Sequence, residues 1–336
     1  MTKNNNKPML VVKDLCKHFP MQGGFFDNTE GVVKAVDGVS FEVYRGTTFG
    51  LVGESGCGKT TAGRMIVKLM EPTSGSIVFH DEQDESDYEI NKLSSKEMKP
   101  LREKIQMIFQ DPYASLDPRM TIEHIIGEPL RALGMKQNME YKNLISDILV
   151  KAGLSSDFMN RYPHAFSGGQ RQRVGIARSL VTKPQLVVAD EPVSALDVSV
   201  QAQIMNLLKE LQKTLNLTFI FIAHDLSVVK YMSDTLAVMY VGRIVEIGDS
   251  EEIFTNPKHP YAEGLISLIP KTFSKTDENA VMPGMVADAS DLPSGCYFHP
   301  RCPYAKDICK EKYPEMQDFG NGHKAACHFD LDLKGV

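Results

Sequence analysis

At residues 53–60 the chain reads Gly53-Glu54-Ser55-Gly56-Cys57-Gly58-Lys59-Thr60, which fits the phosphate-loop pattern G-x-x-x-x-G-K-[ST] at every fixed position. The apolar run 48–52 before it predicts a buried strand, and residues 61–69 after it predict a helix. Glycines in such a loop turn backbone N–H groups toward phosphate oxygens, while the helix N-terminus and Lys59 add positive charge. Thr60 is then placed to bind Mg²⁺. The stretch therefore predicts a binding site for nucleotide phosphates and a magnesium ion.

The composition is ordinary for a soluble globular protein, with 336 residues, 42% hydrophobic and 24% charged. This length suggests about two domains. The net charge of −6 gives no reason to expect a nucleic-acid partner. Because the chain has neither a signal-like start nor an apolar run of about 18 residues, we expect a cytosolic protein whose membrane role comes through partners.

Short apolar runs alternate with turn signals over residues 9–49, at Gly23-Gly24, Asp37-Gly38 and Arg45-Gly46, which predicts antiparallel strands. Phe19 ends the first run, and it is either an aromatic that stacks on adenine or an ordinary packed strand residue. Farther on, residues 81–89 carry six carboxylates and predict a solvated loop.

Polar residues follow three predicted strands at their carboxyl ends. Gln110 follows the strand 105–109, Asp190 and Glu191 end the strand that starts at 185, and His224 follows the strand 217–223. Open α/β sheets bind ligands at this edge. Carboxylates at the end of a buried strand are costly unless they are used, so a role for the Asp190–Glu191 pair on a metal or a water molecule is favoured.

The run Ser167-Gly168-Gly169-Gln170 begins a predicted helix that extends to about Leu180, within a region of helical apolar spacing from 120 to 180. Ser167 and Gln170 have the spacing of a capping box. Two glycines weaken a helix start unless something approaches the backbone closely, and a phosphate suits such a helix N-terminus. Asp197 is either a helix cap or a part of the same chemistry.

These motifs, taken in order, resemble those of ABC-transporter ATPase subunits over nearly the whole chain. The matching segments are Walker A at 53–60, the Q-loop at Gln110, the signature at Phe166 to Gln170 with Phe in place of the usual Leu, Walker B at Leu186 to Glu191, the D-loop at Ser194 to Asp197 and the H-loop at His224. Phe19 falls where the family places its adenine-stacking aromatic.

The resemblance implies an α/β fold. It consists of a RecA-like P-loop ATPase core with an N-terminal antiparallel β subdomain, an α-helical subdomain inserted at about 112–180, and a C-terminal cysteine-bearing extension. We expect the ATPase domain at 8–250 and the extension at 251–336. Residues 256–261 and the cysteine tail are similar to the extension of dipeptide and oligopeptide importer ATPases. The segments 20–33 and 110–116 resemble the F-type subunit (DppF/OppF-like) more than its D-type companion.

The resemblance also assigns chemical roles. ATP hydrolysis would use Glu191, His224 and Gln110 as catalytic residues, with Thr60, Gln110 and Asp190 placing Mg²⁺. Since a Glu pKa of ~4.3 lies far below that of water at ~15.7, Glu191 is expected to orient the attacking water rather than deprotonate it beforehand. The nucleotide contacts are expected at Phe19, Gly53, Glu54, Ser55, Gly56, Cys57, Gly58, Lys59, Thr60, Thr61, Ser167, Gly168, Gly169, Gln170 and Asp197.

The partners that the family implies are a D-type companion ATPase in a head-to-tail dimer, two transmembrane permease subunits contacted through 110–116, and an extracytoplasmic solute-binding protein, with no nucleic acid. The chain would then act at the cytoplasmic face of the membrane and energise uptake of dipeptides or oligopeptides. The alternatives are an importer of nickel or another small solute, a soluble ABC ATPase of DNA repair or translation, and a regulatory module without turnover.

Four of the six cysteines, Cys296, Cys302, Cys309 and Cys327, gather near the end of the chain. Four cytosolic thiolates suit zinc or an iron–sulfur cluster, and their spacing is unlike the paired C-x₂-C of zinc ribbons. The family resemblance favours a [4Fe-4S] cluster over zinc, with uncoordinated thiols as the third alternative. His299, His323 and His328 are alternative ligands. The role would be structural, because the segment from Pro283 onward is poor in apolar residues.

Overall fold

The computed structural model describes residues 7–21, 31–111, 113–269 and 284–333. The chain forms two compact units. The first consists of Met1–Val43, Phe49–Asn91 and Ala223–Val336, and the second of Tyr44–Thr48 and Lys92–Ile222. The predicted turn at Gly23-Gly24, together with Pro112 and Pro283, lies outside the described residues.

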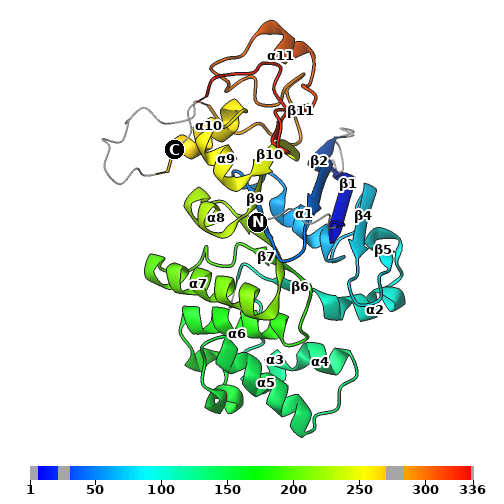
Figure 1. Cartoon of the computed structure of the whole chain (residues 1–336), viewed down its shortest axis with the longest axis vertical. Helices are drawn as coiled ribbons and strands as arrows, with labels where there is room; N and C mark the ends of the chain where they lie inside the picture. The colour runs from blue at the N-terminus through cyan, green and yellow to red at the C-terminus, as the bar shows by residue number, and fades with distance from the viewer. Residues whose placement is uncertain (1–6, 22–30, 112, 270–283, 334–336) are drawn as a thin grey trace, which may run out of the picture. The chain divides into compact units, whose positions relative to one another are not determined.

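An antiparallel sheet forms the start of the first unit, in the order β2-β1-β4-β5 (Figure 1). Its strands are β1 (Leu10–Pro20), β2 (Val32–Val43), β4 (Ser74–His80) and β5 (Asp87–Glu89). The prediction of antiparallel strands is confirmed, but the turn predicted at Asp37-Gly38 is wrong. β2 continues through it, pairing Cys16 with Asp37 and Leu15 with Val39, so that Gly38 (φ 78°) is left unpaired as a β-bulge.

The acidic run 81–89 is also more ordered than its composition predicts. Its last three residues form β5, which pairs with β4, and Asp81 is buried. Lys7 and His80 both contact the Asp87 carboxylate, and their hydrogen bonds lower the pKa of Asp87. These contacts stabilise one carboxylate of the acidic segment where it pairs as a strand.

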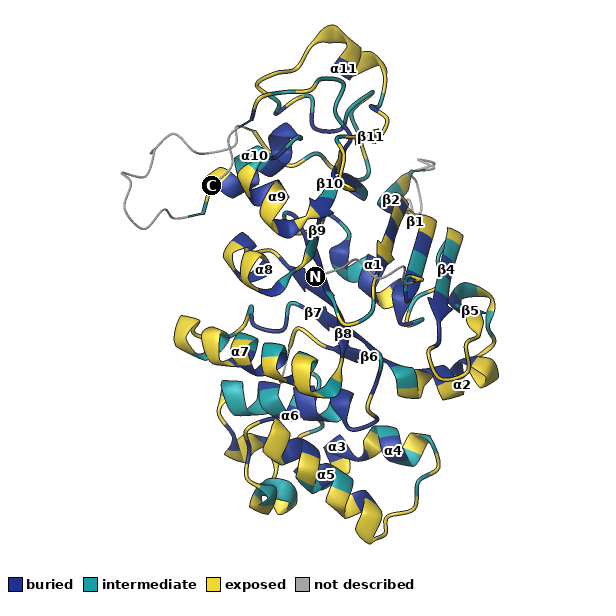
Figure 2. Cartoon of the chain, viewed as in Figure 1, coloured by how far each residue is buried: buried dark blue, intermediate teal, exposed yellow. Residues whose placement is uncertain are grey.

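A second group of strands in the first unit has the order β11-β12-β10-β9-β3, in which β3 and β9 are parallel. The strands are β3 (Thr48–Val52), β9 (Thr235–Tyr240), β10 (Arg243–Asp249), β11 (Gln317–Asp318) and β12 (Lys324–Ala325). Every residue of β3 is buried, as the apolar run predicts. Its parallel neighbour β9 is also drawn mainly in the dark blue of buried residues (Figure 2). The helices of this unit are α1 (Lys59–Ile66), η1 (Ile90–Lys92), α8 (Leu226–Met232), α9 (Ser250–Thr255), α10 (Pro260–Ser267) and α11 (Asp307–Glu311).

The second unit contains parallel strands in the order β8-β7-β6. They are β6 (Ile105–Ile108), β7 (Leu186–Asp190) and β8 (Thr218–Ala223). Its helices are α2 (Ser95–Lys104), α3 (Ile122–Ile126), α4 (Glu128–Ala132), α5 (Met139–Lys151), η2 (Ser156–Asn160), η3 (Pro163–Ala165), α6 (Gly168–Leu180) and α7 (Val198–Leu215). The predicted helical region is therefore present. Within the described residues, no helix is both long and apolar enough to cross a membrane.

Candidate functional site

The phosphate-loop residues connect β3 to α1 in the first unit, which confirms the predicted strand–loop–helix context. The helix begins at Lys59, two residues earlier than expected, and Gly58 is its N-cap with φ 105°. A Cβ at Gly58 would lie 2.0 Å from the Ala35 carbonyl oxygen, and one at Gly53 would lie 2.1 Å from that of Met239. Backbone packing on both sides thus requires glycine at both positions.

Lys59 is buried at the base of this loop. Its ammonium group donates hydrogen bonds to the carbonyl oxygens of Gly53 (2.7 Å) and Glu54 (2.9 Å) and lies 3.6 Å from the Cys57 sulfur. Burial raises the pKa of Cys57, so this thiol stays neutral beside the lysine. An ammonium group that hydrogen bonds hold at the start of a helix is well suited to bind phosphate.

Phe19 lies near the end of β1, with 36% of its surface exposed. The Lys17 ammonium is 5.2 Å from its ring centroid, and the ring is accessible to a stacking ligand. Adenine stacking by Phe19 stays a prediction.

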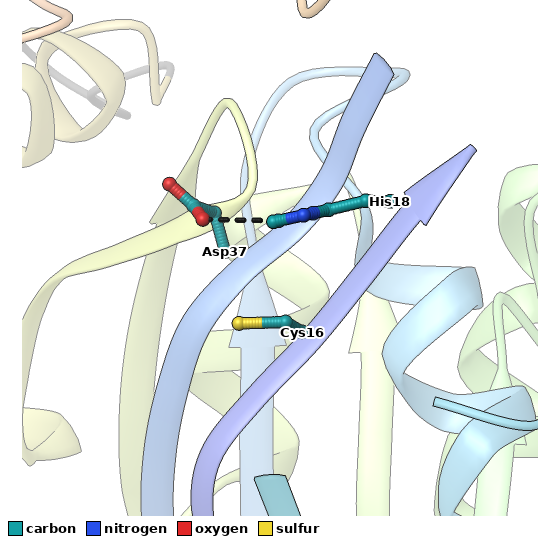
Figure 3. Close-up of side chains that lie close together, drawn as sticks. All are labelled: Cys16, His18 and Asp37. Carbon is teal, nitrogen blue, oxygen red and sulfur yellow. Dashed lines mark hydrogen bonds and ion pairs between the residues drawn. The ribbon is translucent and has the colours of Figure 1, made fainter. Parts of the chain in front are cut away.

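Beside Phe19, the side chains of Cys16, His18 and Asp37 offer three possible metal ligands within 4.8 Å of one another (Figure 3). However, one Asp37 oxygen already accepts from Arg243 (2.7 and 3.0 Å) and from the Tyr297 hydroxyl (3.2 Å), while His18 Nε2 contacts the other at 3.1 Å. Burial raises the pKa of Asp37, but Arg243 and His18 outweigh it and leave the pKa below its ordinary value. We interpret the group as a structural anchor, because the guanidinium already neutralises the carboxylate.

We predict that Asp37→Asn destabilises the protein by about 2 kcal/mol at pH 7, because it leaves the Arg243 charge without its partner. The folded-state pKa of Asp37 is lowered, so this stabilisation is present above the unfolded pKa of about 3.9 and is lost as pH falls through the folded pKa. Urea unfolding at pH 7 and near pH 3 measures the difference. Asp330→Asn, at an exposed ion pair with Lys258, is the control. An equal effect of Asp37→Asn at both pH values would contradict the prediction.

In the second unit, the structure brings two of the predicted strand-end residues together. Gln110 Nε2 donates to Glu191 Oε2 at 3.0 Å, although the two residues are 81 positions apart. Asp190, which precedes Glu191 at the end of β7, is buried. Glu191 has φ 45°, a strained conformation for a glutamate that is typically retained at functional sites. His224 belongs to the first unit, where it is exposed just after β8.

The predicted capping box at the start of α6 is confirmed. The Ser167 hydroxyl accepts from Gln170 N (3.4 Å), and Gln170 Oε1 accepts from Ser167 N (3.0 Å). Phe166, the departure from the family's leucine, is buried against Phe158 with ring centroids 5.4 Å apart. A Cβ at Gly169 would lie 2.6 Å from Val200 Cγ1, so packing against α7 also favours a glycine at this position.

Near α6 the structure corrects one sequence-based expectation and adds one contact that was not expected. Asp197 occupies the N-cap position of α7, but its side chain makes no capping hydrogen bond, so the capping interpretation is wrong. The Arg171 guanidinium lies 4.2 Å from the ring centroid of Tyr113, which joins the segment after Gln110 to the signature helix. No local pattern predicts this pair, because the two residues belong to different motifs.

The four C-terminal cysteines line a single cavity in the first unit, together with His259, His299 and His328. Burial raises the pKa values of Cys296 and Cys302 to about 11 and also raises that of Cys327. Among the described residues, no three of these sulfur and nitrogen atoms lie within 4.8 Å of one another.

The histidines near the cysteines differ in whether they line the cavity. His323, an alternative ligand in the sequence analysis, is not among the described residues that line the cavity, and its Nε2 contacts the buried Glu246 at 2.7 Å. His259 lines the cavity although the sequence did not single it out. Its Nδ1 accepts from Tyr261 N (3.0 Å), and burial lowers its pKa to about 3, so it stays neutral.

Comparison with known proteins places these features in a family. The ABC transporter model matches residues 36–194, and the model for the C-terminal region of oligopeptide/dipeptide transporters matches residues 245–309. The oligopeptide transport ATP-binding protein AppF of Bacillus subtilis is 48% identical over 332 residues, which cover 98% of this chain and 99% of AppF. The chain belongs to the ATP-binding subunits of the oligopeptide/dipeptide ABC transporters. It is therefore an ABC transporter ATPase, which hydrolyses ATP.

Other relatives agree with this placement of the ATPase. The putative oligopeptide transport ATP-binding protein YkfD of B. subtilis is 48% identical, covering 96% of this chain and 95% of YkfD. A dimeric, post-hydrolysis structure of the ATP-binding cassette MJ0796 with ADP and phosphate is 28% identical, with a TM-score of 0.62 over 72% of this chain and 99% of that one. The cbiO1 subunit of Clostridium perfringens is 30% identical, with a TM-score of 0.61 over 74% and 91%.

Proposed function

We propose that this ATPase energises the import of dipeptides and oligopeptides across a membrane. The observation that carries the proposal is the 48% identity to a subunit named for oligopeptide transport, sustained over 98% of this chain and including the C-terminal region. The peptide specificity belongs to the importer as a whole, because an ATPase subunit need not touch the cargo.

We infer the roles of the ATP-binding residues from the motifs that the chain shares with its family. The phosphate loop, with Lys59, would hold the β- and γ-phosphates, and Thr60, Gln110 and Asp190 would place Mg²⁺. Glu191 would orient the attacking water, with Gln110 and His224 assisting. The hydrogen bond between Gln110 and Glu191 supports this assignment, since it holds the carboxylate in one orientation.

Among the partners that the family implies, the exposed start of α6 supports a second ATPase subunit. Ser167 is exposed although its hydroxyl caps the helix, so a phosphate of a nucleotide held by another subunit can reach this N-terminus. We propose a head-to-tail dimer with a D-type companion ATPase, in which each signature helix closes the partner's phosphate loop. This dimer would act with two permease subunits at the cytoplasmic face of the membrane and, through them, with a solute-binding protein. We retain 8–250 and 251–336 as the proposed domains.

Uptake by cells tests the proposed cargo. We expect cells that lack this gene to lose import of a radiolabelled tripeptide, and a plasmid copy of the wild-type gene to restore it. A Glu191→Gln copy should not restore it. Normal tripeptide uptake in the deletion strain, combined with lost nickel uptake, would contradict the peptide proposal and support a metal importer.

We further propose that the four cysteines hold a [4Fe-4S] cluster. Their thiols line one cavity, and thiolates are the ligands that such clusters use. The spacing of these cysteines along the chain is unlike the paired C-x₂-C of zinc ribbons, which favours the cluster over zinc. When bound, the cluster would tie together segments that contain few apolar residues.

Metal analysis after anaerobic purification tests the cluster. We expect about four iron and four sulfide per chain, and a loss of most of that iron in Cys309→Ser, because the variant removes one thiolate ligand. Cys16→Ser, at a cysteine on β1 outside the cavity, should keep its iron. One zinc per chain without iron or labile sulfide would contradict the cluster.

A further inference from the structure

The second residue of the phosphate loop is an acid, Glu54, and its carboxylate is held by a residue of the C-terminal extension. Arg301 Nη1 donates to Glu54 Oε2 at 2.8 Å, and Nη2 donates to Oε1 at 3.1 Å. The Arg301 side chain is 5% exposed and that of Glu54 is 26% exposed. A paired, largely desolvated guanidinium–carboxylate contact fixes both position and charge.

The extension also holds the backbone of the same residue. Glu54 N donates to the hydroxyl of Tyr261, a fully buried residue of α10, at 2.9 Å. Tyr261 packs against Tyr240 and Phe298, with ring centroids 4.6 and 5.4 Å apart. The Arg301 guanidinium lies 5.9 Å from the Tyr240 ring and 5.8 Å from the Phe298 ring. The aromatic cluster therefore keeps Arg301 in position at the loop.

An unpaired carboxylate in a phosphate loop would oppose binding of ATP, because its charge has the same sign as the phosphates. In this chain the charge of Glu54 is balanced by Arg301, which lies 247 residues away. Removing only the arginine should therefore release a negative charge next to the bound phosphates.

We propose that Arg301 is a positioning residue for the nucleotide, which neutralises Glu54 and fixes the start of the phosphate loop. The C-terminal extension thereby sets the affinity of the chain for ATP. The proposal rests on the assignment of the phosphate loop as the ATP site. Its rival is a purely structural pair, in which Arg301 only attaches the extension.

Titration of the purified full chain with the magnesium complex of a non-hydrolysable ATP analogue tests the proposal. We expect Arg301→Ala to weaken binding roughly tenfold or more, with a smaller loss at high salt, because the released charge is screened. Glu54→Gln in the Arg301→Ala background should restore affinity to within about threefold of wild type. Lys258→Ala, which removes another ion pair of the extension, should leave affinity unchanged.

Several outcomes would overturn the proposal. Arg301→Ala with affinity within twofold of wild type would do so, and so would a loss of affinity that Glu54→Gln does not rescue, because a structural pair predicts no rescue. If Arg301→Ala does not fold, Arg301→Lys replaces it. Lysine keeps the positive charge but cannot donate the two parallel hydrogen bonds that Arg301 gives to Glu54. An affinity equal to wild type would then show that these two hydrogen bonds do not position the loop. Unchanged affinity in Lys59→Met would instead overturn the ATP-site assignment itself.

Discussion

Glu191→Gln is expected to reduce ATP turnover by roughly 10²–10³-fold or more while nucleotide binding is retained. Glu191 ends the buried strand β7, has a strained backbone and accepts a hydrogen bond from Gln110. An amide keeps this size and can keep the contact with Gln110, but it cannot accept a proton from water. The variant should therefore bind ATP, associate with the companion ATPase and remain associated.

The measurement combines steady-state phosphate release with size-exclusion chromatography of the variant, the companion ATPase and MgATP. Glu210→Gln, at an exposed position of α7, is the matched control and should behave as wild type. Turnover within threefold of wild type would remove Glu191 from the proposed mechanism. Loss of nucleotide binding in Glu191→Gln would instead assign the residue to holding the loop or the metal.

The parts of the fold that sequence predicts well are those whose causes are local. The strand–loop–helix at 48–66 follows from an apolar run, fixed glycines and a helix N-terminus, all within about twenty residues. The capping box at Ser167 is likewise set by two side chains three positions apart. Family resemblance then located Gln110 and Glu191, and their hydrogen bond confirms that these two residues meet.

The errors arise where a distant residue decides the local outcome. Asp37-Gly38 has the composition of a turn, but Arg243, 206 residues later, binds Asp37 and keeps the pair inside a strand. The imidazole of His323, an alternative ligand, pairs with the buried Glu246 and is not part of the lining of the cysteine cavity. Nothing in the sequence pairs Arg301 with Glu54, because the contact depends on how the extension folds back within the first unit.

The residues proposed for hydrolysis and the phosphate loop are therefore held in place by different parts of the chain. Gln110 and Glu191 follow or end strands whose residues are mostly buried, and such strands can be predicted from the apolar pattern of the sequence. The phosphate loop is positioned by its own glycines and also by Tyr261 and Arg301 from the extension. A substitution in the extension is therefore expected to change the affinity for nucleotide more than it changes the rate of hydrolysis.

Lys59→Met is expected to weaken nucleotide binding about 100-fold, which corresponds to about 2.7 kcal/mol. The buried ammonium of Lys59 ties the carbonyl groups of Gly53 and Glu54 together and is the cation that phosphates would meet. Methionine preserves much of the stem but removes the charge and all three donors. Calorimetric titration with the magnesium complex of a non-hydrolysable ATP analogue measures the loss.

Lys68 supplies a matched control for this variant. It too is a largely buried lysine of the first unit that donates to backbone carbonyl groups, those of Ile90 (3.0 Å) and Asn91 (3.2 Å). Lys68→Met should lower the unfolding temperature without changing nucleotide affinity, because its charge lies outside the phosphate loop. If both variants lost the same affinity, the loss would reflect general destabilisation of the fold, which would contradict a specific role of Lys59. A selective loss in Lys59→Met assigns the charge of this one lysine to the phosphates.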